Sequence, residues 1–235
     1  MENHSFGRLA GALVAPVKTF RAIAERPTWL LAWLLLYAVV SGISFLSFQK
    51  VDFAAGVREQ FAEQHVQLPA GSEERAAKIG KYSASIAVLL AFPFLIFLTA
   101  AIYLAFNLIG GELNYKRSLA VVAHAALPRG LAALLSLPIL LSRSELTLKE
   151  VQQGGVLRAN LSFLAPEGAA PALLALLTNL DLFSFWSLAL SMVGFHYAAM
   201  VSKGAAVTGV LLFWLAGIGL QMGALFLTTH MRGGS

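Results

Sequence analysis

The chain has 235 residues, of which 58% are hydrophobic and 12% are charged. Soluble proteins carry charges on about 25% of their residues, so this composition excludes an ordinary soluble domain and predicts a membrane protein. The net charge is +5, but the basic residues stand beside apolar segments, which favours membrane orientation over binding to nucleic acid.

The first 28 residues are predicted to form an amphipathic segment on the cytoplasmic side of the membrane. Apolar residues recur at three- and four-residue steps, the spacing of one helical face. Pro16 suits the first turn of a helix, so we expect a short helix over about 16–25 in the headgroup region, ended by Pro27. The alternative is a linker whose apolar face packs on the protein itself. Three basic residues are expected to lie at the lipid surface: Lys18, Arg21 and Arg26.

Five apolar segments are long enough to cross a bilayer, which requires about 20 residues each. They are predicted over residues 29–48, 85–109, 118–141, 181–200 and 205–229, followed by a short tail, 230–235. Pro93 predicts a kink in the second span, and Gly110-Gly111 predicts the stop that ends it. The fold class is therefore an all-α, polytopic membrane bundle of five transmembrane helices in one domain, 29–229. Residues 171–179 form an apolar helix too short to span, which is interfacial or re-entrant.

Basic residues predict the orientation of the bundle. If the N-terminus is cytoplasmic, the segments on that side hold a surplus of positive charge, whereas the two long loops nearly balance bases and acids. Five spans then place the C-terminus outside. The cytoplasmic bases are Arg8, Lys18, Arg21, Arg26, Lys116, Arg117 and Lys203.

Three segments of this layout resemble the Yip family, the Rab-interacting five-span membrane proteins, in its bacterial branch. They are the entry 16–27, with a proline at each end; Gly110-Gly111 with the stretch that follows up to Pro128; and 179–186, which opens the fourth span. The resemblance implies a five-span architecture in the inner membrane of a bacterium. Rab binding and vesicle traffic, which the family implies in eukaryotes, are not carried over.

The third span carries Arg129 between two prolines, Pro128 and Pro138. A charge at this depth costs about 2.5–3.5 kcal/mol on insertion scales and usually faces a bundle interior or water. Arg129 is thus either a binding or gating residue for an anionic headgroup or substrate, or a structural arginine bonded to carbonyls that the prolines leave free. The spans hold no internal acid, so an acidic partner would come from their ends or loops. The candidates are Glu112, Glu167 and Asp181, the last also a helix cap.

Two intramembrane histidines, His124 and His196, could form a proton relay or a metal pair, or bond to neighbouring helices. They lack the spacing and acidic companions of metal ligands, so no metal or other cofactor is predicted. Common motifs of hydrolases and nucleotide-binding enzymes are missing, and with no cysteine there is no thiol nucleophile, so no enzyme is predicted.

Two functions remain in view. The first is a membrane-organising or adaptor protein that acts through contacts with lipids and with helices of other membrane proteins or of a second copy. The alternative is a small transporter or lipid-handling protein that uses the kinked third span and a buried Arg129.

Overall fold

The computed structural model describes residues 5–63, 71–166 and 168–233, and this part of the chain is helical throughout apart from turns and loops. The all-α prediction is therefore confirmed. The helices are α1 (Ser5–Val14), α2 (Pro16–Glu25), α3 (Leu30–Gln49), α4 (Phe53–Glu63), α5 (Ser72–Leu108), α6 (Tyr115–Ala125), α7 (Leu127–Ser142), α8 (Leu148–Gln152), the 3-10 helix η1 (Leu161–Leu164), α9 (Pro171–Asn179), α10 (Leu182–Ala198) and α11 (Lys203–Gly233).

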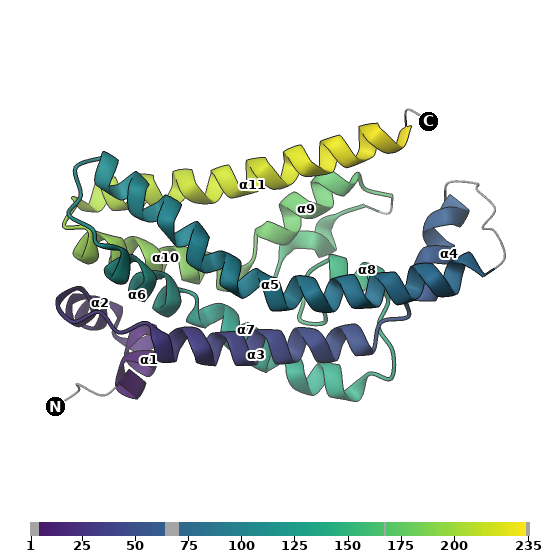
Figure 1. Ribbon diagram of the computed structural model, residues 1–235, viewed down its shortest axis with the longest axis horizontal. Coiled ribbons are helices and arrows are strands. Elements are labelled where there is room, and N and C mark those ends of the chain that lie inside the picture. The colour runs from purple at the N-terminus through teal and green to yellow at the C-terminus, as the bar shows by residue number, and fades with distance from the viewer. Residues whose placement is uncertain (1–4, 64–70, 167, 234–235) are drawn as a thin grey trace.

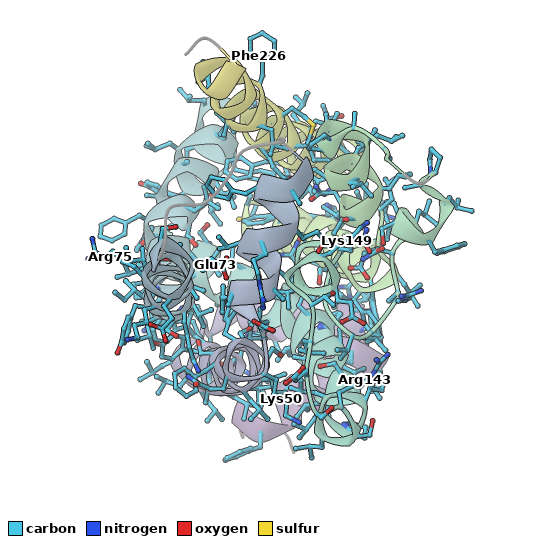
Figure 2. All side chains as sticks on the ribbon, turned by 90° about the vertical axis from the view of Figure 1, so that its right-hand side faces the viewer. Lys50, Glu73, Arg75, Arg143, Lys149 and Phe226 are labelled. Carbon is cyan, nitrogen blue, oxygen red and sulfur yellow. The ribbon has the colours of Figure 1, made fainter. Side chains whose placement is uncertain are left out.

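The long helices run along one axis and leave two different ends (Figure 1). One end, called here the hairpin end, holds α1, α2 and the tight loops 109–114 and 199–202. The opposite end, called the loop end, holds α4, α8 and the C-terminus. Figure 2 looks onto the loop end, where Lys50, Glu73 and Arg75 are among the labelled residues of both charge signs.

Several helices match the predicted spans. Among the described residues, α3, the pair α6–α7 and α11 are long and apolar enough to cross a membrane. The long helix α5 qualifies as a fourth if its two parts, bent by 45° around Pro93, are taken as one span, and this bend confirms the predicted kink. The fourth predicted span corresponds to α10, a shorter apolar helix of 17 residues. A multi-pass membrane bundle is thus confirmed, and the count of five spans stays a prediction.

The main core lies near the hairpin end, where α2, α6 and α10 meet. Phe20 and Ile23 of α2 are 0% exposed and belong to the same cluster as Val121. A Cβ atom on Gly194 would lie 2.6 Å from Val121 Cγ1 and 3.0 Å from the Phe20 ring. Only glycine at this position allows the three helices to approach so closely, so the hairpin of α1 and α2 is an integral part of the bundle.

The predicted helix over 16–25 is confirmed as α2, but its apolar face is turned inward. Phe20 and Ile23 fill the protein core, which is the second of the two alternatives that the sequence left open. Protein side chains shield these residues because α10 and α6 offer a complementary surface directly beneath α2. The basic side chains of α2 stay on the outside, so their contact with lipid remains a prediction.

The predicted stop after the second span is confirmed, because α5 ends at Leu108. Gly110 has a φ of +86°, which a residue with a side chain rarely adopts. A Cβ atom on Gly111 would lie 2.7 Å from the Phe106 carbonyl oxygen, to which the Gly111 N–H donates a hydrogen bond of 2.9 Å. The next amide, that of Glu112, donates to the carbonyl of Ala199 at 2.9 Å, so the two tight loops of the hairpin end are joined.

A second, smaller core ties the loop end together. Val51, Leu140 and Leu146 are buried in one cluster between the ends of α3 and α7. The Lys50 ammonium donates to the carbonyl oxygens of Leu140 and Arg143, at 2.8 and 2.5 Å. The Leu140 carbonyl also accepts the Arg143 amide, at 3.4 Å, so the Lys50 bonds add to this cap and fix α3 beside α7.

Candidate functional site

The hairpin end gathers basic residues from three segments that are far apart in the sequence. Helix α2 and its end supply three, the start of α6 supplies two, and the start of α11 supplies one. All are exposed except Arg117, which is half-buried, and the acids that accompany them in the described residues are Glu25 and Glu112. We call these bases the basic surface: Lys18, Arg21, Arg26, Lys116, Arg117 and Lys203.

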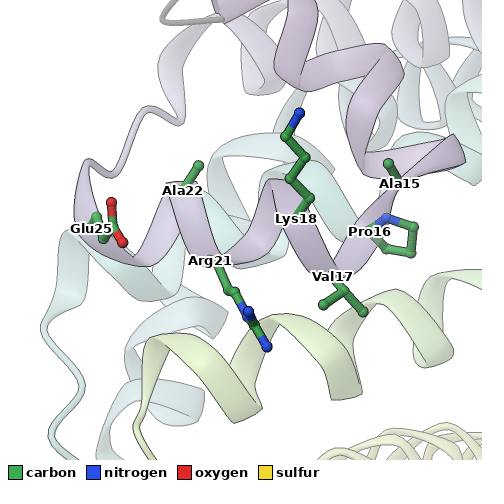
Figure 3. Close-up of a pocket in the computed structure, with 7 residues that line it drawn as sticks. All are labelled: Ala15, Pro16, Val17, Lys18, Arg21, Ala22 and Glu25. Atoms are coloured by element: carbon green, nitrogen blue, oxygen red, sulfur yellow. The ribbon is translucent and has the colours of Figure 1, made fainter.

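Within the basic surface, Arg21 is held against α10. Its Nη2 atom donates to the Tyr197 hydroxyl at 3.2 Å, and the guanidinium carbon lies 4.9 Å from the centre of the Tyr197 ring. Figure 3 shows the Arg21 side chain directed toward α10, whereas Lys18 points away from it on the other side of α2. These residues border an open depression of about 610 Å³ on the outer face of α2, so its charges are accessible.

Arg8 is the basic residue whose role the sequence did not reveal. It was counted as a cytoplasmic charge, yet its side chain is buried, with 6% exposure. Its Nη1 atom donates to the Arg26 carbonyl at 2.5 Å and to the Thr28 hydroxyl at 2.9 Å. Arg8 therefore fastens α1 to the connection between α2 and α3. The only local signal is weak: Arg8 stands one helical turn before Ala12, a fully buried residue.

Arg129 lies at the middle of the 28-residue candidate span formed by α6 and α7. The neighbouring Pro128 is fully buried, and a Cβ atom on Gly130 would lie 2.8 Å from Leu36 of α3. The Arg129 side chain itself is exposed, and its role, functional or structural, stays a prediction.

A pocket lined by both apolar and polar side chains lies between α3, α7 and the start of α10, beneath the segment 146–160. It has a volume of about 340 Å³. Side chains on its wall include the hydroxyl groups of Ser44, Ser47 and Ser136, the amide of Asn160 and the carboxylate of Asp181. On α7 the pocket is lined by residues 132, 133 and 136, and Arg129 precedes these by three, four and seven positions. Arg129 itself is not among the residues that line the pocket.

Asp181 confirms the predicted helix cap. Its carboxylate accepts hydrogen bonds from the amides of Phe183, at 3.4 Å, and Ser184, at 2.8 Å. The described residues include no ion pair between Asp181 and Arg129, so the pairing of Arg129 with one of the three predicted acids stays a prediction.

Of the other two predicted partners, Glu112 lies within the described residues. Glu112 is exposed in the loop before α6, at the hairpin end rather than at mid-span. Glu167 lies outside the described residues.

The two histidines bond to backbone carbonyls. His124 is 2% exposed, and its Nδ1 atom lies 2.8 Å from the Ala120 carbonyl oxygen one turn earlier. The His196 Nδ1 atom lies 2.7 Å from the carbonyl oxygen of Val201, in the loop after α10. Each ring therefore has a structural role as a partner of a backbone carbonyl. In the described part of the chain, no group of three histidine, aspartate or glutamate residues is arranged to hold a metal ion.

Comparison with known proteins gives the family. No curated protein and no solved structure matches the chain. A family model described as the Yip1 domain matches residues 10–225, which include every predicted span in whole or in large part. That range contains α2, the glycine turn before α6 and the capped start of α10, the three segments on which the resemblance was based. The chain therefore belongs to the Yip1 domain family of membrane proteins.

Proposed function

We propose that this protein organises the bacterial inner membrane in which it lies, as a non-enzymatic adaptor that binds anionic lipid on its cytoplasmic side. The observation that carries the proposal is the basic surface, which three separate segments form at one end of the bundle. In this arrangement the N-terminus is cytoplasmic and the C-terminus is outside, because short basic segments beside membrane spans stay on the cytoplasmic side.

The docking of α2 makes this surface more than a set of independent charges. Phe20 and Ile23 hold α2 on α10, and the bond between Arg21 and Tyr197 joins the same two helices at the surface. Each basic residue near an anionic membrane surface adds about 1 kcal/mol of attraction. A rigid set of such residues loses little conformational entropy when lipid binds, so the attraction is used more fully than in a flexible tail.

Contact with partner helices is the second part of the proposed role. In the candidate span of α11, only 6% of the residues are buried inside the protein. Cβ atoms on Gly217, Gly219 and Gly223 would meet no atom within 4 Å. Small residues on an open helix face let another transmembrane helix approach closely, so α11 is the helix that we assign to such contacts.

A lipid-handling role is the second candidate function, and Arg129 favours it. An exposed arginine at mid-span, without an ion pair in the described residues, is typical of a site for a polar ligand within a membrane protein.

The first test measures lipid retained by the protein. Native mass spectrometry of protein released from nanodiscs that contain anionic and neutral lipids counts the bound lipids. A variant with Lys18→Glu, Lys116→Glu and Lys203→Glu, one change in each segment of the basic surface, should lose its anionic lipids. The matched control reverses three exposed bases near the loop end, Arg75, Lys78 and Arg158. Equal retention of anionic lipid by the two variants would contradict the proposal.

The orientation can be tested separately, because the chain has no cysteine to give background labelling. Ser144→Cys and Glu112→Cys place single thiols at exposed positions near opposite ends of α6–α7. A membrane-impermeant maleimide should label position 144 on intact cells from outside, and position 112 only after the membrane is opened. The reverse pattern would place the basic surface outside and remove the basis of the cytoplasmic assignment.

A further inference from the structure

We propose that α9 and α10 form a single broken transmembrane span, and that the pocket at the break is a water-filled cavity inside the membrane that takes small polar solutes from the loop end. Three observations point to it: the length of α10, the depth at which α9 meets α10, and the lining of the pocket between α3, α7 and the start of α10. The inference goes beyond the proposed function. It depends neither on the basic surface nor on which side of the membrane is cytoplasmic.

Helix α10 is too short to cross the membrane alone. Its 17 residues measure about 25 Å, against about 30 Å of hydrocarbon. Residues 194–198 do not add to the crossing, because a Cβ atom on Gly194 would lie 3.0 Å from the Phe20 ring of α2, and α2 precedes the first span and so lies at the level of the headgroups. The twelve residues before them measure about 18 Å, so α10 begins about 12 Å inside the hydrocarbon.

Helix α9 completes the crossing. Its 9 residues measure about 13 Å, which matches the part of the membrane that α10 leaves uncrossed. At the end of α9, the Asn179 Nδ2 atom donates to the Gln221 Oε1 atom of α11 at 2.7 Å. Gln221 lies inside the candidate span of α11, six residues before its end at Leu227, so the end of α9 lies within the membrane. Figure 1 shows α9 beside α11, between the loop end and α10.

The backbone at the break has the partners that a membrane requires. Non-helical backbone is tolerated at this depth only where protein or water satisfies its polar groups. The Leu161 amide donates to the Leu180 carbonyl at 3.2 Å, and the Leu182 amide donates to the Ala159 carbonyl at 3.1 Å. Asn160, which lies between these two bonds, is 5% exposed and lines the pocket. The segment before α9 therefore reaches the break and pairs with it inside the bundle.

The pocket lies at the depth of this break. It is lined by Ser44 and Ser47 on α3 and by Ser136 on α7. Ser44 precedes the end of α3 by five residues, and Ser136 precedes the end of α7 by six, so the pocket reaches about 8–9 Å below the ends of both helices. Its volume of about 340 Å³ has room for about ten water molecules.

The polar groups on the wall of the pocket require water. The Asp181 side chain is half-buried and lines the pocket, and the described residues include no ion pair to it. A carboxylate at this depth faces a bundle interior or water, since hydrocarbon does not solvate it. The hydroxyls of Ser47 and Ser136 donate to carbonyls of their own helices, at 2.9 and 2.7 Å, so their oxygen atoms can accept hydrogen bonds. The wall thus suits water and small solutes that carry N–H or O–H donors.

The test measures the reactivity of single cysteines, which is possible because the chain has none of its own. The full chain is placed in nanodiscs, where both membrane surfaces meet the solvent, and a charged thiosulfonate reagent is added. Ser136→Cys and Ser44→Cys place thiols on two walls of the pocket. The matched controls are Leu134→Cys and Phe45→Cys, at exposed positions that do not line the pocket and lie within about 3 Å of the same depth.

The two pocket positions should react about 100-fold faster than their controls. The thiolate is the form that attacks the reagent, and the cost of bringing a charge into hydrocarbon corresponds to about 100-fold. Thermal unfolding followed by circular dichroism verifies that each variant is folded. Pocket positions that react as slowly as their controls would show a cavity without water. Controls that react as fast as the pocket positions would show that the cavity is not inside the membrane. Either result would overturn the proposal.

The same experiment tests the broken span. Leu173 and Leu176 of α9 are 40% and 41% exposed, and neither lines the pocket. With α9 inside the membrane, Leu173→Cys and Leu176→Cys should react as slowly as Leu134→Cys. Rates as fast as that of Ser144→Cys, an exposed position near the loop end, would place α9 in water and overturn the broken span. Reversal of the three lysines of the basic surface should leave all these rates unchanged, so this proposal and the proposed function fail separately.

Discussion

The docking of the N-terminal hairpin can be tested at Phe20. Its ring is 0% exposed and lies between α2, α6 and α10, within 3.0 Å of the position that a Cβ atom would occupy on Gly194. The change Phe20→Ala removes the whole ring and leaves a cavity at the centre of the main core. The backbone of α2 keeps its helical preference, because alanine is the best helix former. The substitution therefore weakens the docking of α2 and not the helix itself.

The expected loss follows from the complete burial of the ring. Replacing a buried phenylalanine by alanine costs about 3–5 kcal/mol in protein cores. We use the lower value of this range, about 3 kcal/mol. Since about 1.4 kcal/mol corresponds to a factor of ten, the undocked population should rise by about 100-fold.

Hydrogen–deuterium exchange with mass spectrometry measures this population. The 10-residue helix α2 is too short to be stable alone in water, so its amides exchange when it leaves α10. In nanodiscs, the amides of α2 should exchange about 100-fold faster in Phe20→Ala than in the wild type, while those of α10 change much less.

A matched control is present in the same hairpin. Phe6 of α1 is 71% exposed, so Phe6→Ala removes an identical side chain with little loss of protein contact. Equal exchange rates for α2 in the Phe6→Ala and Phe20→Ala variants would refute the argument. They would show that burial of the Phe20 ring does not hold α2 on the bundle.

Three further predictions concern turns and caps. Gly111→Ala should lower the melting temperature in detergent, because the new Cβ atom would lie 2.7 Å from a backbone oxygen. The control Gly217→Ala should leave the melting temperature unchanged or raise it, because open space surrounds position 217 and alanine favours a helix. Asp181→Ala removes two hydrogen bonds to the start of α10, so it should lower the free energy of unfolding by about 0.5–2 kcal/mol, measured by chemical unfolding. A smaller loss than that caused by an alanine substitution at an exposed position would show that Asp181 does not stabilise the helix as a cap. The pKa of Glu150 is lowered, chiefly by the hydrogen bond from the Thr147 amide, so the ionised carboxylate stabilises the capping box of α8 at neutral pH. This stabilisation is lost as the pH falls through the pKa of Glu150 in the folded state. The Thr147 amide resonance should titrate below the ordinary glutamate pKa of about 4.3, and a midpoint at or above that value would rule out the bond in solution.

Local features of the sequence predicted most of the helices. The length of the apolar segments, the proline at position 16 and the glycine pair at 110–111 each act on the backbone within a few residues. The helix over 16–25, the bend at Pro93 and the cap at Asp181 follow from such local effects, and the structure confirms all three. The family resemblance rested on the same local segments.

The sequence alone did not predict where individual side chains point, because their direction depends on the tertiary structure. Nothing near Arg8 in the sequence shows that its guanidinium reaches the Arg26 carbonyl and the Thr28 hydroxyl, because that contact depends on how α1 folds back on the segment before α3. The sequence left two directions for the apolar face of α2, and the presence of α10 beneath Phe20 decided between them.

Arg129 also shows the difference between what the sequence determines and what the tertiary structure decides. The sequence by itself determined that a charged residue lies at the middle of a span, because the length of the apolar segment and the position of the arginine are both local facts. Whether this residue is buried depends on how α3 and α10 pack against α7. A helix specifies its own length and faces through nearby residues, whereas a pocket between helices exists only once residues more than a hundred positions apart, such as Ser44 and Asp181, pack around it.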